Sequence, residues 1–286
     1  MSLIQGWLPP SRQNWELIVN LFSYVFPLFT CLQWLTDWYP MGKTSITSRF
    51  NIPGKVAWTL MEVPGFSTLV YIMFALPKQL GIGALPWGNW LMTGLFVTHY
   101  VYRALLAPLV LNPSMSPIHP LVAFFAAGFQ MANALSIGGW LAGYGPTDAG
   151  YWDGRTLQVG VGTVIWAAGL IGNIYHDDVL RDIRRVAMRK KEDDKARGKA
   201  SDSSKVYQVP EKGLFRYVLY AHYLCEWIEW TGYWVMGGVG CIPARTFVIN
   251  EITTMLPRAT SGKRWYIAKF GKEKIGGRKA AIPGLI

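Results

Sequence analysis

The chain has 286 residues and a formal net charge of +11, yet only 16% of its residues are charged and 51% are hydrophobic. A soluble domain averages about 25% charged residues, so this composition argues against a soluble globular protein and indicates a polytopic membrane protein. The basic residues lie next to apolar segments, as in the inner loops of membrane proteins, so the positive charge does not indicate a nucleic-acid partner. Cys31, Cys225 and Cys241 lack the spacing of a metal site or a disulfide framework.

Seven apolar segments are long enough to cross a bilayer, which takes roughly 20 helical residues. Polar residues interrupt the last two, Glu226 and Glu229 in the sixth and Arg245 and Glu251 in the seventh. This is typical of helices that line a cavity rather than face lipid. We therefore expect an all-α, polytopic integral membrane protein that forms a single domain over residues 1–286. The seven segments are residues 15–36, 56–76, 84–111, 118–142, 156–180, 212–236 and 239–257.

Loop charge predicts the orientation of these spans, because Lys and Arg gather in cytosolic loops. Residues 181–199 hold nine Lys and Arg, and residues 258–279 hold eight. Two spans separate these stretches, so both are expected in the cytosol, with the N-terminus outside or in the lumen and the C-terminus in the cytosol. Residues 186–205 are charged and rich in Ser, which indicates a flexible cytosolic loop. The membrane would be the endoplasmic reticulum of a eukaryote or the inner membrane of a bacterium.

A glutamate lies within the second span. Glu62 is preceded by Trp58 and followed by Pro64 in an otherwise apolar stretch. An ionisable residue inside a membrane helix is a functional candidate by default. Burial disfavours the charged form, so a neutral Glu62 could donate a hydrogen bond. The alternative is a carboxyl group that a neighbouring helix satisfies.

The third span carries His99, Tyr100 and Arg103, with His99 and Arg103 four residues apart on one face. The hydroxyl of Tyr100, supported by Glu62, could polarise the carbonyl group of a ketone. The alternative is a tyrosine of the interfacial aromatic belt, with Arg103 simply at the inner membrane surface.

At the end of the fifth span four polar residues, Asn173, Asp177, Arg181 and Arg184, fall on one side of a continued helix. An amide, a carboxylate and two guanidinium groups suit a ribose and phosphates, because the planar fork of Arg matches phosphate. The alternative is the end of a membrane helix with arginines on the cytosolic side.

The sixth span places Glu226 and Glu229 at i and i+3. The histidine spacing of a carboxylate di-metal site is missing, so we expect no metal. The two carboxylates could instead accept hydrogen bonds from a carboxamide or from ribose hydroxyls. A basic patch follows at residues 258–266 and Arg278-Lys279, whose alternative role is binding of anionic lipid at the membrane surface. The glycines at residues 237–240 follow no strand, so they do not indicate a Rossmann fold.

Taken together and in this order, these motifs resemble those of the steroid 5-alpha-reductase family. The resemblance covers roughly residues 55–286. The residues that carry it are Trp58, Glu62 and Pro64; His99, Tyr100 and Arg103; Asn173, Ile174, Asp177, Leu180, Arg181 and Arg184; Gly213–Val218; Glu226, Glu229, Trp230, Gly232 and Tyr233; and Arg278-Lys279-Ala280-Ala281-Ile282-Pro283.

The resemblance implies a seven-helix membrane enzyme that uses NADPH to reduce a carbon–carbon double bond conjugated to a ketone in a lipophilic substrate, a steroid or a terpenoid. It implies that Glu62 and Tyr100 hold the substrate carbonyl, beside Trp58 and Arg103. The residues that it implies for the cofactor are Asn173, Asp177, Arg181, Arg184, Tyr207, His222, Glu226, Arg258, Tyr266, Arg278 and Lys279.

Two other functions are compatible with an interrupted membrane bundle. A membrane methyltransferase of the isoprenylcysteine type would close its last helices over S-adenosylmethionine and would need neither Glu62 nor Tyr100. A non-catalytic lipid-binding or transport protein would need polar residues along a through path, whereas here they gather in the cytosolic half. Binding of NADPH, of S-adenosylmethionine or of neither separates the three hypotheses.

Overall fold

The computed structural model of the chain describes residues 5–35, 48–197 and 207–286. Its regular elements are all helices, and the described residues contain no strand, only three isolated bridges between extended residues. The expectation of an all-α fold is confirmed. The helices are α1 (Arg12–Asn20), α2 (Phe26–Cys31), α3 (Gly54–Leu80), α4 (Trp87–Val101), α5 (Pro120–Gly139), α6 (Ala149–Asp153), α7 (Thr156–Ala196), α8 (Ala221–Gly237), α9 (Ile242–Phe270) and α10 (Lys272–Ile275).

Five helical stretches are long and apolar enough to cross a membrane, and they coincide with the first five expected segments. Three of them include π-helical turns, at Leu21–Val25, Tyr102–Leu111 and Trp140–Tyr144, that continue the neighbouring α-helices. The exposed aromatic pair Phe124 and Phe125, 73% and 68% accessible, suits contact with lipid. The five stretches are Arg12–Trp34, Gly54–Leu80, Trp87–Leu111, Pro120–Tyr144 and Thr156–Asp194.

The last two expected segments differ from the other five. Helix α8 is only 17 residues long and carries two buried glutamates, and α9 carries Arg245 and Glu251. Of the described helices, neither α8 nor α9 meets the length and composition of a membrane span. Their bounds also shift. α8 begins at Ala221, after a 3₁₀ turn at Gly213–Arg216, and α9 continues past residue 257 to Phe270.

The expected flexible loop at residues 186–205 is wrong over its first half, because α7 continues as a helix to Ala196. The segment is rich in Ala, Met, Arg, Lys and Glu, all good helix formers, so high charge does not by itself end the helix. Residues 198–205 lie outside the described part of the chain.

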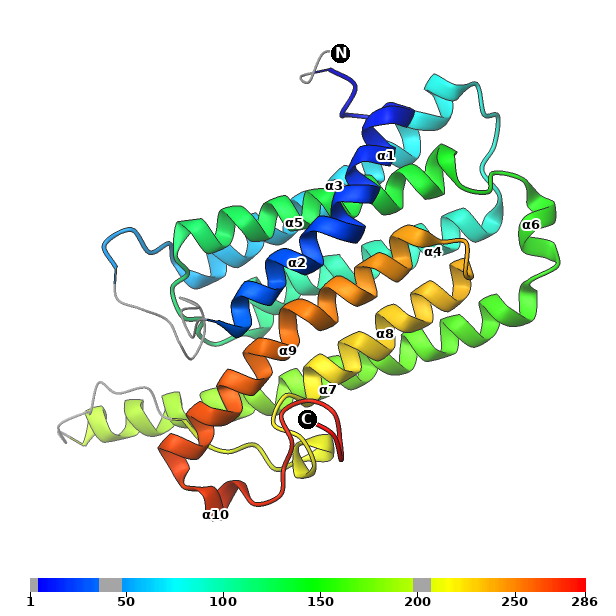
Figure 1. Cartoon of the computed structure of the whole chain (residues 1–286). Helices are drawn as coiled ribbons and strands as arrows, with labels where there is room; N and C mark the ends of the chain where they lie inside the picture. Colours follow the sequence, from blue (N-terminus) through cyan, green and yellow to red (C-terminus); the bar gives the residue numbers. More distant parts are fainter. Residues whose placement is uncertain (1–4, 36–47, 198–206) are drawn as a thin grey trace.

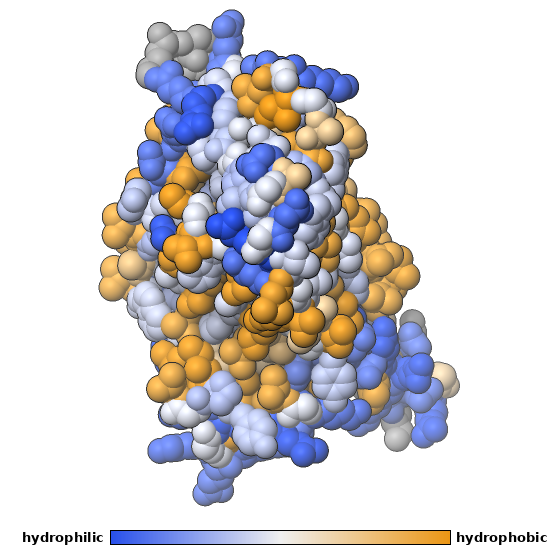
Figure 2. Space-filling model, turned by 90° about the vertical axis from the view of Figure 1, so that its right-hand side faces the viewer, coloured by the Kyte–Doolittle hydropathy of each residue, from blue (hydrophilic) through white to orange (hydrophobic). Residues whose placement is uncertain are grey.

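The helices lie side by side in a bundle, and α7 reaches well beyond it (Figure 1). The most extensive contacts are between α7 and α8 and between α3 and α5, while α9 packs against α8 and α2. Figure 2 shows hydrophobic side chains along both flanks of one face, with more polar ones near its centre. This distribution is that of a bundle with an apolar perimeter.

Glycines bring α7 and α8 unusually close together. A Cβ atom at Gly169 of α7 would collide with the backbone of Glu229, and one at Gly232 of α8 would collide with the backbone of Trp166. Small residues of this kind allow membrane helices to approach closely. The close approach lets polar side chains of α7 and α8 reach one interior site.

The π-helical continuation of α4 exposes two carbonyl groups that α3 satisfies. Pro108 has no N–H, so it cannot donate to the carbonyl of Arg103 at i−5 or of Ala104 at i−4. Instead, Trp58 Nε1 donates to the Arg103 carbonyl at 3.1 Å and Thr59 Oγ1 donates to the Ala104 carbonyl at 3.0 Å. These bonds fix the position of Arg103 against α3.

Candidate active site

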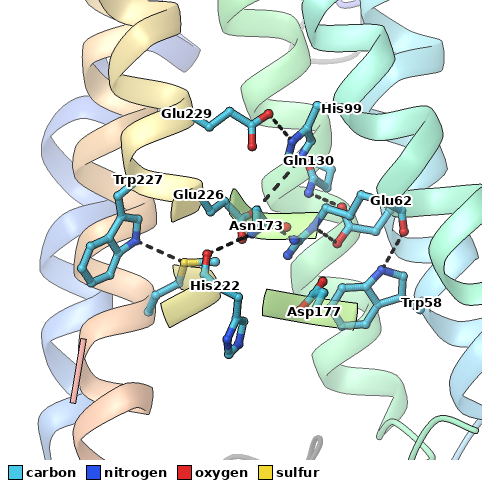
Figure 3. Close-up of polar contacts among 12 residues, drawn as sticks. Trp58, Glu62, His99, Gln130, Asn173, Asp177, His222, Glu226, Trp227 and Glu229 are labelled. Carbon is cyan, nitrogen blue, oxygen red and sulfur yellow. Dashed lines mark hydrogen bonds and ion pairs between the residues drawn. The ribbon is translucent and has the colours of Figure 1, made fainter. Parts of the chain in front are cut away.

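Arg103 connects two buried glutamates from different helices, Glu62 and Glu226. Figure 3 shows these two glutamates among the polar side chains around them. The Nε atom of Arg103 lies 3.2 Å from Oε1 of Glu62, and its Nη1 atom lies 2.9 Å from Oε1 of Glu226. The second oxygen of Glu62 accepts a hydrogen bond of 2.5 Å from Nε2 of Gln130 on α5. The guanidinium group of Arg103 therefore links α3 with α8, and α5 joins them through Glu62.

The same network continues through α4 and α7. Nδ1 of His99 lies 2.7 Å from Oε1 of Glu229, and Nε2 of His99 lies 4.0 Å from Oε1 of Glu226. Asn173 donates from Nδ2 to the backbone carbonyl of His222 at 2.9 Å and to Oε2 of Glu226 at 3.4 Å. All of these side chains except that of His222 are buried. We refer to Glu62, His99, Arg103, Gln130, Asn173, Glu226 and Glu229 as the inner network.

Tyr100 lies beside this network and is 1% exposed. Its hydroxyl group makes no hydrogen bond to any residue that the structure describes, although Glu62 and Arg103 lie within electrostatic range. The expected hydrogen bond between Tyr100 and Glu62 is therefore not present. Both oxygens of Glu62 accept hydrogen bonds, one of them from a cation. Both carboxylate oxygens of Glu62 are therefore engaged as acceptors, by Arg103 and by Gln130, and not by Tyr100.

A chain of aromatic rings runs from Tyr100 to the N-terminal helix. Tyr100 and Trp230 have ring centroids 5.9 Å apart, Trp230 and Phe247 4.6 Å, Phe247 and Phe129 5.9 Å, and Phe129 and Phe26 5.0 Å. We call these five residues the aromatic wall. The wall is built from residues of five helices, in ring order α4, α8, α9, α5 and the N-terminal α2.

A second group of expected residues lies further along α7. Arg181 is 2% exposed, and it pairs with Asp178 and with Asp177 at 3.7 Å. It also donates to the hydroxyl of Tyr102 at 2.5 Å. Arg184 is exposed and makes no ion pair or hydrogen bond among the described residues, although Asp177 lies within electrostatic range. Arg181 thus anchors α7 to α4, whereas the guanidinium group of Arg184 is accessible.

Two tyrosines from the last third of the chain join Arg184. Tyr207 and Tyr266 both lie within electrostatic range of it. Burial raises the pKa of both phenols, and the positive charge of Arg184 acts in the opposite direction. The ring of Tyr207 packs on Trp265 at 4.9 Å between centroids. We call Asp177, Arg181, Arg184, Tyr207 and Tyr266 the outer cluster.

The other expected residues lie at the margins of these groups. Arg278 is within electrostatic range of Tyr266, but its guanidinium donates to the carbonyls of Ile275, Pro210 and Lys274 and so organises the C-terminal loop. Lys279 is not brought to either group; its backbone pairs with residues 217–219 and its Nζ donates to Leu285.

Arg258 and His222 make contacts that the sequence did not indicate. Arg258 Nε lies 3.4 Å from Oε1 of Gln33 in the N-terminal stretch and is within electrostatic range of Glu251. His222 contributes its backbone carbonyl to Asn173, while its imidazole packs against the rings of Tyr220 and Tyr223.

Several residues of the site were missed by sequence reasoning. Gln130, a partner of Glu62, could have been found as a polar residue in an otherwise apolar span. His176 is buried, bonds through Nδ1 to the Gly172 carbonyl and accepts through Nε2 from the Leu214 amide. It thereby docks the turn after residue 212 onto α7. Within the described residues no group of three or more His, Cys, Asp or Glu has the arrangement of a metal site.

Comparison with known proteins gives a consistent result. A family model described as 3-oxo-5-alpha-steroid 4-dehydrogenase matches residues 115–286, more than half of the chain. The steroid 5-alpha-reductase DET2 of Solanum lycopersicum is 30% identical over 93% of this chain and 97% of its own length. The 3-oxo-5-alpha-steroid 4-dehydrogenase 1 of Bos taurus is 29% identical over 86% of this chain and 88% of its own. The Schizosaccharomyces pombe protein named uncharacterized protein C9.08c is 34% identical over 92% of this chain and 96% of its own length.

The family match includes α7, α8 and α9, and so most of the inner network and the outer cluster. The tomato relative extends the similarity to nearly the whole length, including the helices that carry Glu62 and Tyr100. The chain therefore belongs to the steroid 5-alpha-reductase family and is an oxidoreductase that acts on CH–CH groups.

Proposed function

We propose that this protein reduces the carbon–carbon double bond of an α,β-unsaturated ketone in a 3-oxo-Δ4 steroid or a related terpenoid lipid, with NADPH as the reductant. The observation that carries the proposal is Tyr100. Its ring is buried, its hydroxyl makes no hydrogen bond to the described residues, and it lies at the end of the aromatic wall, within electrostatic range of Arg103 and Glu62.

The position of Tyr100 suits the chemistry of enone reduction. When hydride adds to the β carbon of an enone, negative charge develops on the carbonyl oxygen. A buried donor aimed at that oxygen stabilises the transition state by several kcal/mol. Tyr100 supplies the donor, and the positive charge of Arg103 lies close by. Glu62 holds Arg103 in place together with Glu226, and Gln130 in turn holds Glu62.

The residues present fit a dinucleotide cofactor. The accessible guanidinium of Arg184 suits a phosphate, and Oε2 of Glu229 is a buried acceptor without a partner, which suits a carboxamide N–H. We assign the outer cluster, with Arg278, Lys279 and Arg258, to the phosphates and the adenosine part, and Asn173, His222 and Glu226 to the nicotinamide half. NADPH, when bound, supplies the hydride. Arg181 acts mainly by positioning, since Tyr102 and two aspartates already occupy its donors.

The aromatic wall and Trp58 support a flat, lipophilic substrate. Trp58 lies 5.3 Å from the Arg103 guanidinium carbon in a cation–π contact, so it borders the same site. Buried aromatic rings offer a large apolar area with little conformational freedom to lose. A rigid polycyclic or terpenoid skeleton would match them.

The membrane arrangement belongs to the same proposal. We propose one seven-helix domain, in which α8 and α9 complete the bundle around the polar interior, with the N-terminus outside or in the lumen and the C-terminus in the cytosol. NADPH would then reach α7 from the cytosol. The membrane is that of the endoplasmic reticulum in a eukaryotic cell or the inner membrane of a bacterium.

The direct test uses the full chain in nanodiscs with NADPH and a 3-oxo-4-ene steroid. We expect consumption of NADPH and a product heavier by two hydrogens, with deuterium from labelled NADPH at the β carbon. The matched control is the same steroid ketone without the double bond, which should not be reduced. Failure to consume NADPH with a panel of steroid and terpenoid enones, together with no NADPH binding, would overturn the proposal.

A further inference from the structure

A cavity of about 840 Å³ opens on the surface between the turn that precedes α8 and the C-terminal segment. Five basic side chains line it, together with one carboxyl group, that of Glu211. Glu211 is exposed and forms no ion pair within the described part of the chain, so it does not neutralise these cations. The basic residues are Lys212, Arg216, Lys274, Arg278 and Lys279. We call this space the basic cavity.

Backbone hydrogen bonds hold the two walls of the basic cavity together. The amide of Lys279 donates to the carbonyl of Tyr217 at 2.8 Å, and the amide of Leu219 donates to the carbonyl of Lys279 at 2.9 Å. The guanidinium of Arg278 donates to the carbonyl of Pro210 at 3.1 Å and so crosses between the walls. Figure 1 shows the red C-terminal segment beside the yellow turn. The basic cavity is therefore a fixed feature of the fold.

The turn that forms one wall is docked directly on α7. The amide of Leu214 donates to Nε2 of His176 at 2.9 Å. A Cβ atom at Gly213 would lie 2.7 Å from the ring of Tyr175, so only glycine fits this contact without a shift. The level of the cavity along α7 is thus the level of residues 175 and 176.

The exposed surface of α7 changes its character at this level. Ile171 and Tyr175 are 67% and 48% exposed, and they continue the apolar surface of the fifth span. On the same stripe of the helix, the side chains of Asp178 and Asp182 are 47% and 57% exposed. The ring of Tyr217, which lines the cavity, is also exposed, as is common for tyrosines at a membrane interface. The basic cavity therefore lies where the apolar surface ends, at the depth of lipid head groups.

The charge of the basic cavity has no internal counterpart. Lys212, Arg216 and Lys274 are exposed, and the side chains of Lys212 and Arg216 make no hydrogen bond or ion pair among the described residues. Arg278 and Lys279 also line the cavity, but we have assigned them to the cofactor, so the other three are the cations left for a separate ligand. A basic pocket at the membrane surface attracts anionic head groups.

We propose that the basic cavity binds the phosphate head group of an anionic phospholipid from the surrounding bilayer. Lys212, Arg216 and Lys274 supply the positive charge, and the exposed ring of Tyr217 offers an apolar contact for the lipid. The attraction between exposed charges is screened by salt, so binding should weaken as ionic strength rises.

The test titrates the full chain, in a neutral detergent, with dioleoyl phosphatidylglycerol and with dioleoyl phosphatidylcholine, and native mass spectrometry measures the bound lipid. The wild type should bind the anionic lipid at least tenfold more tightly. The double variant Lys212→Ala/Arg216→Ala should bring this preference to within about threefold of unity, because each basic side chain near a head group accounts for about a fivefold change in affinity. Lys212→Arg/Arg216→Lys keeps the charge and should keep the preference.

Lys190→Ala/Lys191→Ala is the matched control, since it removes the same charge from the exposed end of α7 and should leave the preference intact. The inference is overturned if the wild type shows no preference, or if this control loses it as fully as the cavity variant does. Displacement of the lipid by glycerol phosphate at the same concentration would assign the cavity to a soluble phosphate instead. Displacement by NADPH would make the cavity part of the cofactor site.

Discussion

Nδ1 of His99 lies 2.7 Å from Oε1 of Glu229, and both side chains are buried where α4 meets α8. A hydrogen bond of this kind ties two helices together away from water. Removal of one partner leaves the other without compensation in an apolar interior, which costs more than the bond itself contributes.

Glu229→Ala should therefore destabilise the protein by about 2–4 kcal/mol, through the unpaired His99 and the cavity. Glu229→Gln keeps the shape and an acceptor, so it should cost only about 1 kcal/mol. Thermal unfolding in detergent, followed by loss of helical signal, measures the difference. Equal loss of stability in the two variants would mean that the His99 contact is not what holds these helices.

Tyr100→Phe should lower turnover by about 10²-fold or more, because it removes the donor to the developing oxyanion. NADPH binding should barely change. Tyr233→Phe is the matched control, since Tyr233 is also fully buried and its hydroxyl has no partner. Its turnover should stay near the wild-type value. If Tyr100→Phe behaves like Tyr233→Phe, Tyr100 has no part in the mechanism.

The two arginines of α7 should separate cofactor binding from stability. Arg184→Ala should weaken NADPH binding by about 1.5–3 kcal/mol, the range for a charged hydrogen bond. It should leave stability unchanged, because Arg184 makes no bond among the described residues. Arg181→Ala should weaken binding and also lower the melting temperature, since Arg181 holds Tyr102.

Titration of NADPH by fluorescence, beside thermal unfolding, measures both effects. Arg185→Ala is the control, because Arg185 pairs with Asp182 and the Leu111 carbonyl away from the outer cluster. Unchanged NADPH affinity in Arg184→Ala and Arg181→Ala would mean that these arginines only mark the cytosolic end of the helix.

Close packing of α7 on α8 gives a test that needs no ligand. Gly169→Ala places a methyl group against the backbone of Glu229, so it should destabilise the protein and disturb the inner network. Gly160→Ala, on the same helix with open space around it, should be neutral or slightly stabilising. Thermal unfolding measures the stability of both variants against that of the wild type. A neutral Gly169→Ala would contradict the close approach of the two helices.

The sequence predicted the membrane class, the first five spans and the residues that now meet at Arg103, because each of those residues interrupts an apolar stretch. It did not predict Gln130 as the partner of Glu62, since the pairing depends on how α3 packs against α5. The role of the His222 carbonyl was equally out of reach, because a backbone group carries no sequence signal. The charge of residues 186–196 indicated a loop, but their good helix propensity lets α7 continue to Ala196.

Variants of Glu62 test whether this side chain acts on the substrate carbonyl through Arg103 or as a hydrogen-bond donor itself. Arg103 and Gln130 both donate to its carboxyl group, so both of its oxygens act as acceptors. Glu62→Gln keeps the shape but replaces the carboxyl group that faces Arg103 with an amide, which leaves Glu226 as the one ion-pair partner of Arg103 within the described part of the chain. We expect turnover to fall at least tenfold in Glu62→Gln and further in Glu62→Ala, with NADPH affinity within about threefold of wild type in both. Gln130→Glu would place a second carboxylate beside Glu62 and should also lower turnover.

Steady-state kinetics with an enone lipid measures the turnover of all three variants. Near wild-type turnover in Glu62→Gln would restore the neutral, hydrogen-donating Glu62, because an amide can donate but cannot carry the charge.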